Sequence, residues 1–331
     1  MKKNIFFLPF LGFLLLWACN GNDDSVPMLD SKGIPEVNNL FKEIAKSPDD
    51  PALFMQLGKV YYDNEGFDEA IQCFQKAIQL DSSQTNYYHR LADVYWDYNK
   101  SYEALTTMQR ASGRFPDSTN TLLMLSEMQM KLKTYKPSME TAKRVLNLQP
   151  MNDEAFYMIG MNLKYLGDTL GALKSFQTVV DRNEDHLPAY QELAILCDNS
   201  RKDELALQYF DNALRIDSLD QFTAFNLANF YQRRKQDNAA IYWYQRAVKA
   251  NKNFPEPYYN IGIIYLEYDS FQVAYNHFNI AANLAPDFDR AFFYRGLAAE
   301  KMGKKQMAME DYNQAYQINP DNKRAKRALG K

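Results

Sequence analysis

The sequence predicts an all-α solenoid, in which short helix–turn–helix units stack one on another. Three observations support this prediction. A single pattern recurs every 34 residues from Pro51 onward without a change of phase. Within each period, large apolar residues are spaced three and four apart in two segments, as on the faces of two helices. Two positions of every period hold only Gly, Ala or Ser, which lets the two helix backbones approach closely.

The stretch Pro255–Phe288 displays the pattern, with its positions counted from Pro255. Positions 4, 7, 11, 20, 24 and 27 hold Tyr258, Ile261, Tyr265, Ala274, Phe278 and Ala281. Position 8 of the successive periods holds Gly58, Ala92, Ser126, Gly160, Ala194, Ala228, Gly262 and Gly296. Position 20 holds Ala70, Ala104, Ser138, Ala172, Ala206, Ala240, Ala274 and Ala308. An agreement this regular predicts that every period forms the same pair of helices.

The period and its small residues resemble the tetratricopeptide repeat, which is 34 residues long. The resemblance covers eight repeats in residues 51–322: 51–84, 85–118, 119–152, 153–186, 187–220, 221–254, 255–288 and 289–322. It implies that the repeats stack into a right-handed superhelix. A solenoid exposes an apolar face at each end, so terminal helices with a polar outer side are expected to cover them. We expect an N-terminal capping helix in 35–50, and a C-terminal one in 323–331 with Ala325, Ala328 and Leu329 facing inward.

The first 34 residues predict export and lipid attachment. Residues 1–18 combine a basic start with an apolar run from Ile5 to Trp17, which is too short to span a bilayer and is typical of a signal peptide. The run ends in Leu16-Trp17-Ala18-Cys19, which resembles the lipobox of bacterial lipoproteins and implies acylation of Cys19. Trp17 departs from the small residue usual in that motif. A cleaved signal without acylation and an uncleaved anchor are the alternatives.

Residues 19–34 predict a flexible tether, because they are rich in Asn, Asp, Ser and Gly and lack an apolar period. Asn20 replaces the aspartate that retains some lipoproteins in the inner membrane, so the outer membrane is the expected location. Asp23-Asp24 resembles the acidic signal that sends some Bacteroidetes lipoproteins to the cell surface. A simple soluble tether is the alternative, and it leaves the protein facing the periplasm.

The net charge argues against a nucleic-acid-binding protein, and the cysteine positions argue against a disulfide-stabilised one. The formal net charge of −3 falls to about −5 once Lys2 and Lys3 leave with the signal peptide, which argues against a nucleic-acid partner. Cys73 and Cys197 lie in repeats 1 and 5, too far apart in a stacked array for a disulfide. Cys197 occupies a core position and is expected to be a small buried apolar residue.

The sequence contains none of the familiar catalytic motifs, such as HExxH, GxSxG or a phosphate-binding GxxxxGK. His89, His186 and His277 fall in repeats 2, 4 and 7, too far apart to share a metal ion. We therefore predict no catalytic residues, no metal, no cofactor and no enzymatic activity. An enzyme with a site assembled from distant residues stays an alternative.

The resemblance implies that the first helix of each repeat lines a concave groove, with positions 2, 5, 6, 9, 12 and 13 facing a ligand. The apolar and aromatic candidates at these positions are Met55, Tyr62, His89, Trp96, Leu123, Met130, Tyr157, Met161, Tyr165, Phe225, Tyr259, Ile263, Leu266 and Phe293. Such a surface suits an extended peptide or a partner helix. The alternative is that these side chains pack between adjacent first helices and leave little exposed.

Polar candidates in repeats 6 to 8 echo the dicarboxylate clamp of chaperone-binding repeats. Asn229, Asn260 and Arg290 match that clamp in kind, whereas Phe225 and Tyr294 stand where it has a lysine and an arginine. Asparagine at these positions is also common in ordinary repeats, so a working clamp is not expected.

The sequence therefore predicts a lipid-anchored scaffold that binds protein partners in the cell envelope. It looks like the repeat lipoproteins that serve outer-membrane barrel assembly, pilus secretin assembly or recruitment of peptidoglycan hydrolases. A surface-exposed binder of exported peptides or glycans is the main alternative. Apolar grooves in such arrays can also pair with each other, so a homodimer is a further arrangement.

Overall fold

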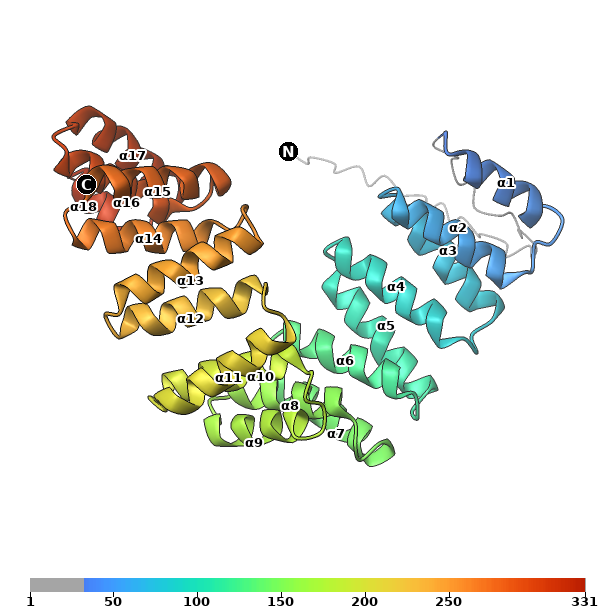
Figure 1. The fold of residues 1–331 in the computed structure, drawn as a ribbon. Coiled ribbons are helices and arrows are strands. Elements are labelled where there is room, and N and C mark those ends of the chain that lie inside the picture. The colour runs from blue at the N-terminus through green and yellow to red at the C-terminus, as the bar shows by residue number, and fades with distance from the viewer. Residues whose placement is uncertain (1–32, 331) are drawn as a thin grey trace, which may run out of the picture. The chain divides into compact units, whose positions relative to one another are not determined.

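The computed structural model describes residues 33–330, and these residues form eighteen α-helices and no strand (Figure 1). Eight consecutive helix pairs follow the 34-residue pattern, so the predicted fold class is confirmed. The signal peptide, Cys19 and nearly all of the predicted tether lie outside the described residues. None of the described helices is long and apolar enough to cross a lipid bilayer.

The first helix of every repeat occupies positions 1 to 13. These helices are α2 (Pro51–Asp63), α4 (Thr85–Asp97), α6 (Thr119–Lys131), α8 (Asp153–Tyr165), α10 (Leu187–Asn199), α12 (Gln221–Arg233), α14 (Pro255–Glu267) and α16 (Asp289–Lys301). The residue before the helix caps five of them, as Asp50 does when its carboxylate accepts the N–H of Ala52 at 2.9 Å.

The second helix begins at position 17 and, in seven repeats, ends at position 30. These helices are α3 (Phe67–Leu80), α5 (Ser101–Arg114), α7 (Tyr135–Leu148), α9 (Thr169–Val180), α11 (Asp203–Ile216), α13 (Asp237–Ala250), α15 (Phe271–Leu284) and α17 (Lys305–Ile318). In repeat 4, α9 ends two residues early, where the chain turns at Asp181.

The turn inside each repeat has one geometry throughout. The N–H of position 16 donates to the carbonyl of position 11 at 2.8–3.0 Å, as in the bond from Gly66 to Tyr61. This closure places position 15 in the left-handed region, with φ between 53° and 85°. The residues at position 15 are Glu65, Asn99, Lys133, Gly167, Arg201, Lys235, Asp269 and Gly303. Six of the eight repeats therefore place a residue with a side chain where glycine is favoured, at a local cost on the order of 1 kcal/mol each.

Large rings at position 24 fill the space left by small residues at position 8. A Cβ added to Gly58, Gly160 or Gly262 would lie within 2.6–2.7 Å of the ring at position 24 of the same repeat. A Cβ does not lie that close to a ring in real structures, so at these three positions a larger residue would force the ring to shift. Repeats 5 and 6 combine alanine at position 8 with a ring at position 24, so this requirement is specific to repeats 1, 4 and 7. The close approach predicted from the small residues thus has a specific cause.

Two short helices flank the repeats. Helix α1 (Pro35–Ile44) packs Val37, Leu40 and Ile44 against the first repeat, and the rest of the predicted segment 35–50 forms turns. Helix α18 (Lys323–Ala328) buries Ala325 and packs Leu329 against repeat 8. The expectation that Ala328 faces inward is wrong: it is exposed, because the helix is only six residues long and ends there.

The helices gather into two compact units, residues 33–116 and 117–330. Within each unit the second helix of a repeat contacts the first helix of the next repeat, so the helix pairs stack as predicted. The 34-residue phase continues through the division without a slip. The two units are described separately below.

Candidate functional site

The candidate site is the face formed by positions 2, 5, 6, 9, 12 and 13 of the first helices, which we call the first-helix face. In the unit of residues 33–116, Met55 and Tyr62 are half-buried and pack against the core of repeat 1. The Tyr62 hydroxyl donates to the Asp97 carboxylate of repeat 2. Burial of the ring, followed by this bond, raises the pKa of Tyr62 to about 12. Tyr62 therefore joins two repeats and exposes only part of its ring.

The other two candidates of this unit differ in exposure. Trp96 is half-buried, whereas His89 is only 8% exposed. Burial, and then the nearby positive charge of Arg90, lowers the pKa of His89. His89 therefore stays neutral at pH 7 and offers almost no surface to a ligand.

In the unit of residues 117–330, the candidates of repeats 3 and 4 are graded from half-buried to exposed. Leu123, Met130 and Met161 are half-buried. Tyr165 is 50% exposed and stacks on Tyr135, with ring centroids 5.0 Å apart. Tyr165 thus offers the largest exposed ring among the predicted candidates of these two repeats.

The rings at position 5 are part of the helix-pair interior as well as of the first-helix face. Four of them lie 5.4–5.8 Å from the ring at position 24 of the same repeat. The pairs are Tyr157–Phe176, Phe225–Tyr244, Tyr259–Phe278 and Phe293–Tyr312. Three of these position-5 rings remain half-exposed, whereas Phe293 is only 9% exposed. Burial raises the pKa of Tyr157, and that of Tyr259 to about 12. These rings therefore pack on the second helix of their own repeat, and not only between adjacent first helices as the alternative had it. Tyr259 does both, because its ring centroid also lies 5.7 Å from that of Tyr294 on the next first helix.

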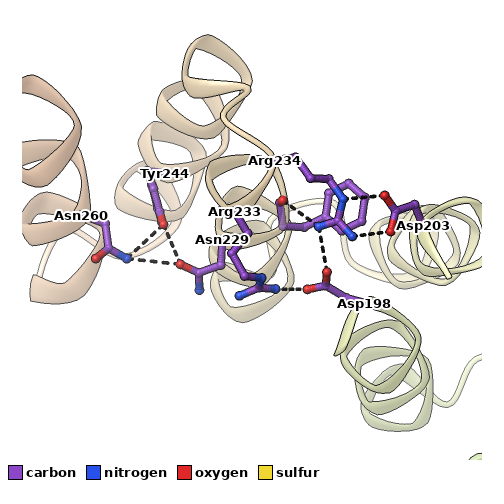
Figure 2. A network of polar contacts seen from close by, with 8 residues as sticks. Asp198, Asp203, Asn229, Arg233, Arg234, Tyr244 and Asn260 are labelled. Carbon is purple, nitrogen blue, oxygen red and sulfur yellow. Dashed lines mark hydrogen bonds and ion pairs between the residues drawn. The ribbon is translucent and has the colours of Figure 1, made fainter. Parts of the chain in front are cut away.

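The two clamp-like asparagines meet at a tyrosine hydroxyl (Figure 2). Asn260 Nδ2 donates to the Tyr244 hydroxyl at 3.0 Å, and Tyr244 lies 2.6 Å from both Asn229 Oδ1 and Gln232 Oε1. The hydroxyl has one proton, so it can donate to only one of these two oxygens. Exchanging the oxygen and nitrogen of the Gln232 amide lets its Nε2 donate to the Tyr244 hydroxyl. The hydroxyl then accepts from Gln232 and Asn260 and donates to Asn229 Oδ1. Asn229 Nδ2 and Asn260 Oδ1 then keep their hydrogen-bonding capacity for a ligand.

A cluster of ion pairs lies beside this network and joins repeats 5 and 6 (Figure 2). The Asp198 side chain is only 3% exposed and pairs with both Arg233 and Arg234. Arg234 also donates from Nε to Asp203 Oδ2 at 2.7 Å. A buried carboxylate needs such partners, because an unpaired charge there would be strongly destabilising. The cluster is best explained as a link between neighbouring repeats.

Sequence reasoning missed one exposed ring of the first-helix face. Phe222 occupies position 2 of repeat 6, is 53% exposed and lies 5.9 Å from Phe254. The position rule that selected the other candidates applies to it equally. Arg290, at the same position of repeat 8, is exposed, and its guanidinium lies 5.5 Å from the Tyr259 ring centroid.

The described residues bring together neither a metal-ligating group nor an activated thiol. Between residues 33 and 330, no three His, Cys, Asp or Glu side chains come together as a metal site would require. Cys73 and Cys197 are both buried and free, which for Cys197 agrees with the predicted role of a small buried core residue. Burial raises the pKa of both thiols, so neither is an activated nucleophile.

Comparison with family models identifies the repeats. Two models described as tetratricopeptide repeat match residues 154–186 and 290–322, which are repeats 4 and 8. A third, described as TPR repeat, matches residues 58–97 and 228–267.

The matching curated proteins are much longer than this chain. The Peroxisomal targeting signal receptor of Candida glabrata is 30% identical over 104 residues, which are 31% of this chain and 17% of the receptor. The Protein O-mannosyl-transferase TMTC3 of Homo sapiens is 22% identical over 237 residues, which are 66% of this chain and 26% of that protein. This chain spans about a quarter or less of the length of either relative.

Solved structures share the fold at low identity. A chain of the APC/C hetero-tetramer Cut9-Hcn1 has a TM-score of 0.58 at 13% identity, covering 89% of this chain and 58% of that one. A tetratricopeptide repeat protein from Parabacteroides merdae has a TM-score of 0.56 at 15% identity, covering 74% of this chain and 97% of that one. At these identities the similarity concerns the fold alone.

Proposed function

Because the chain contains tetratricopeptide repeats, we propose that it is a non-enzymatic scaffold that binds a protein or peptide on its first-helix face. Repeats of this kind generally mediate protein–protein interaction. One matched relative is by name a receptor for a targeting signal. The observation that carries the proposal is the pairing, in residues 117–330, of half-exposed rings with amides that retain hydrogen-bonding capacity. Phe225 and Tyr259 provide apolar contact, while Asn229 and Asn260 can bond a peptide backbone.

We further propose that the protein is anchored in the bacterial outer membrane through lipid on Cys19. The support is the sequence alone: a basic start, a short apolar run and the lipobox-like Leu16–Cys19. Several acyl chains make a lasting anchor, because each buried methylene contributes about 0.8 kcal/mol. Metabolic labelling with a fatty-acid analogue should mark the wild type and leave Cys19→Ser unlabelled. Labelling that persists in Cys19→Ser would disprove the anchor.

The binding function is tested by a crosslinked pull-down from whole membranes. One variant combines Tyr165→Ser with Phe222→Ser, two exposed rings of the first-helix face. Its matched control combines Tyr102→Ser with Tyr242→Ser, two exposed rings of the second helices. We expect the first variant to lose the partners that the wild type and the control recover. Equal recovery by all three proteins would contradict the proposed surface.

The same experiment addresses the remaining alternatives. A homodimer would appear as a crosslinked product of twice the chain mass that the first variant loses. Protease treatment of intact cells separates a protein that faces the periplasm from a surface-exposed binder of exported peptides or glycans, because only the surface protein would be cleaved.

A further inference from the structure

A cationic pocket closes the C-terminal end of the first-helix face. It has a volume of about 440 Å³ and lies among helices α14, α16 and α18. Its lining residues are Tyr259, Asp289, Arg290, Phe293, Tyr294, Asn319, Asn322, Lys323, Arg324. The pocket thus combines three aromatic rings, three cations and two amides in one small space.

The positive charge of this pocket is not balanced by carboxylates. Among the described residues, neither Arg290, Lys323 nor Arg324 forms an ion pair. The single lining carboxylate, Asp289, already accepts hydrogen bonds from the side-chain amides of Asn319 and Asn322 at 2.9 and 2.8 Å. The pocket therefore has a net positive charge, which favours an anionic ligand.

Aromatic rings hold the two arginines in place. The Arg290 guanidinium lies 5.5 Å from the ring centroid of Tyr259 and 5.1 Å from that of Phe288, and it makes no hydrogen bond within the described residues. The Arg324 guanidinium lies 5.6 Å from the Tyr294 ring and donates to its hydroxyl. Cation–π contacts orient a guanidinium and leave its N–H groups available. Arg290 is thus positioned to donate to a carboxylate.

We propose that this pocket binds a carboxylate of an acidic peptide segment, with an apolar side chain of the same segment against Tyr259 and Tyr294. The inference rests on the proposed function, since it names the partner chemistry of one end of the first-helix face. Arg290 and the neighbouring Asn260 match the clamp that the sequence only partly echoes, but the other cations of the pocket do not belong to that match. Here the cations come from repeat 8 and from helix α18, with Lys323 and Arg324 supplied by the cap.

The surroundings of the pocket favour a peptide over another anion. Asn260 follows Tyr259 on α14, and its Oδ1 accepts no hydrogen bond within the described residues. Helices α14 and α16 contact each other directly, so this amide and the pocket belong to adjoining surfaces. A peptide could use the Asn260 amide for its backbone, the rings for an apolar side chain and the arginines for a carboxylate.

The test uses two fluorescein-labelled peptides, one of phenylalanine followed by glutamates and its counterpart with glutamines. Anisotropy with the full acylated protein in detergent should show preferential binding of the glutamate peptide. We expect Arg290→Ala and Arg324→Ala each to weaken that binding about tenfold, the loss of a charged hydrogen bond. Arg327→Ala removes the same charge from the same helix outside the pocket and should bind as the wild type does.

Arg290→Ala keeps the test informative if Arg324→Ala is unstable, because Arg290 is exposed and makes no hydrogen bond or ion pair within the described residues. Equal binding by the wild type, Arg290→Ala and Arg327→Ala would overturn the inference, as would the absence of any preference for glutamate. A preference for phosphatidylglycerol over phosphatidylcholine vesicles that Arg290→Ala abolishes, without peptide binding, would assign the pocket to lipid instead. If the peptide preference fails while the Tyr165 and Phe222 variant still loses membrane partners, only this inference falls.

Discussion

In repeat 7 the two helices meet through a ring that lies on a glycine, whereas in repeat 3 they meet through hydrogen-bonded hydroxyls. The Phe278 ring leaves only 2.7 Å for a Cβ on Gly262. At the same positions, 8 and 24, repeat 3 has Ser126 and the small Ala142. Its space is closed by polar groups, because the Ser138 hydroxyl donates to the Ser126 carbonyl at 2.7 Å.

The polar interior of repeat 3 consists of a network of Ser126, Ser138 and Asn162 and a separate pair of Thr141 and Gln129. Ser126 Oγ lies 2.9 Å from the Ser138 carbonyl, and Asn162 of repeat 4 donates from Nδ2 to Ser138 Oγ at 2.8 Å. The Thr141 hydroxyl lies 2.8 Å from Gln129 Oε1. All five side chains are buried. The comparison shows that the same helix pair can form around a large ring packed on glycine or around small side chains joined by hydrogen bonds.

The largest expected effect comes from removing the ring of repeat 7. Phe278→Ala should reduce the free energy of unfolding of that repeat by about 3–5 kcal/mol, because it leaves a cavity over Gly262. Hydrogen exchange of the α14 and α15 amides measures the loss locally, which suits an array whose repeats can open separately. Val273→Ala, on the exposed side of the same helix, is the control and should cost far less. Equal losses would mean that the ring does not hold the pair together.

The reciprocal change adds a carbon beneath the ring. Gly262→Ala should cost about 1–3 kcal/mol, because the new Cβ would overlap the Phe278 ring. Combining it with Phe278→Leu should recover part of the loss, since the smaller side chain leaves room. The coupling between the two changes is obtained from a double-mutant cycle. Simple additivity would show that the contact is not the cause.

In repeat 3 the equivalent test removes a hydrogen bond. Ser138→Ala should cost about 1–2 kcal/mol, because it removes the buried hydrogen bonds that the Ser138 hydroxyl donates to the Ser126 carbonyl and accepts from Asn162 Nδ2. The double change Ser126→Ala with Ser138→Ala should cost less than the sum of the two single changes. Repeat 7 already has alanine, Ala274, at this position. Urea denaturation followed by hydrogen exchange of α6 and α7 provides the values, and additive losses would argue against a shared network.

The smallest expected effect is on the stability of repeat 7 at acidic pH. Position 23 is Thr141 in repeat 3 but His277 in repeat 7, where the imidazole centroid lies 5.8 Å from that of the Tyr265 ring and 6.4 Å from that of the Tyr258 ring. Burial lowers the pKa of His277 below its usual 6.5, so the folded repeat keeps it neutral while the unfolded chain takes up a proton. Its contribution to stability is present above pH 6.5 and is lost as the pH falls further.

Replacing the histidine tests this sign directly. His277→Thr should make hydrogen exchange in α15 less sensitive to acid than it is in the wild type, with little change above neutral pH. An unchanged acid sensitivity would show that other groups set it.

Sequence periodicity was sufficient to predict the helix pairs and their stacking, because small and large residues recur in one phase from Pro51 to the end of repeat 8. It did not predict the left-handed residue at position 15. Only Gly167 and Gly303 are glycines, the residue that usually marks a positive φ. At Lys133 and Arg201 the same conformation accompanies the hydrogen bond from the N–H of position 16 to the carbonyl of position 11. Backbone closure overrides residue preference at these turns.

The candidate site was less predictable than the fold. Position rules place a residue on a helix face, but they do not tell whether a ring such as Phe293 rests on a neighbouring ring. That depends on the volume at position 24, where Tyr312 leaves Phe293 nearly buried. The sequence predicted Arg290 as a groove candidate and a polar outer side for the C-terminal cap, but not a shared pocket, because Arg290 and Arg324 line one space only when repeat 8 and α18 are packed together.

The central claim is that the first-helix face, and not the second-helix surface, binds the partner. A photo-crosslinking amino acid placed at Phe222 on α12 or at Tyr242 on α13 tests it within a single repeat. The two native side chains are 53% and 52% exposed, so their access to solvent is matched. In living cells, crosslinked partners should form from position 222 and be absent from position 242. Crosslinks of equal yield at both positions, or at 242 alone, would contradict the account.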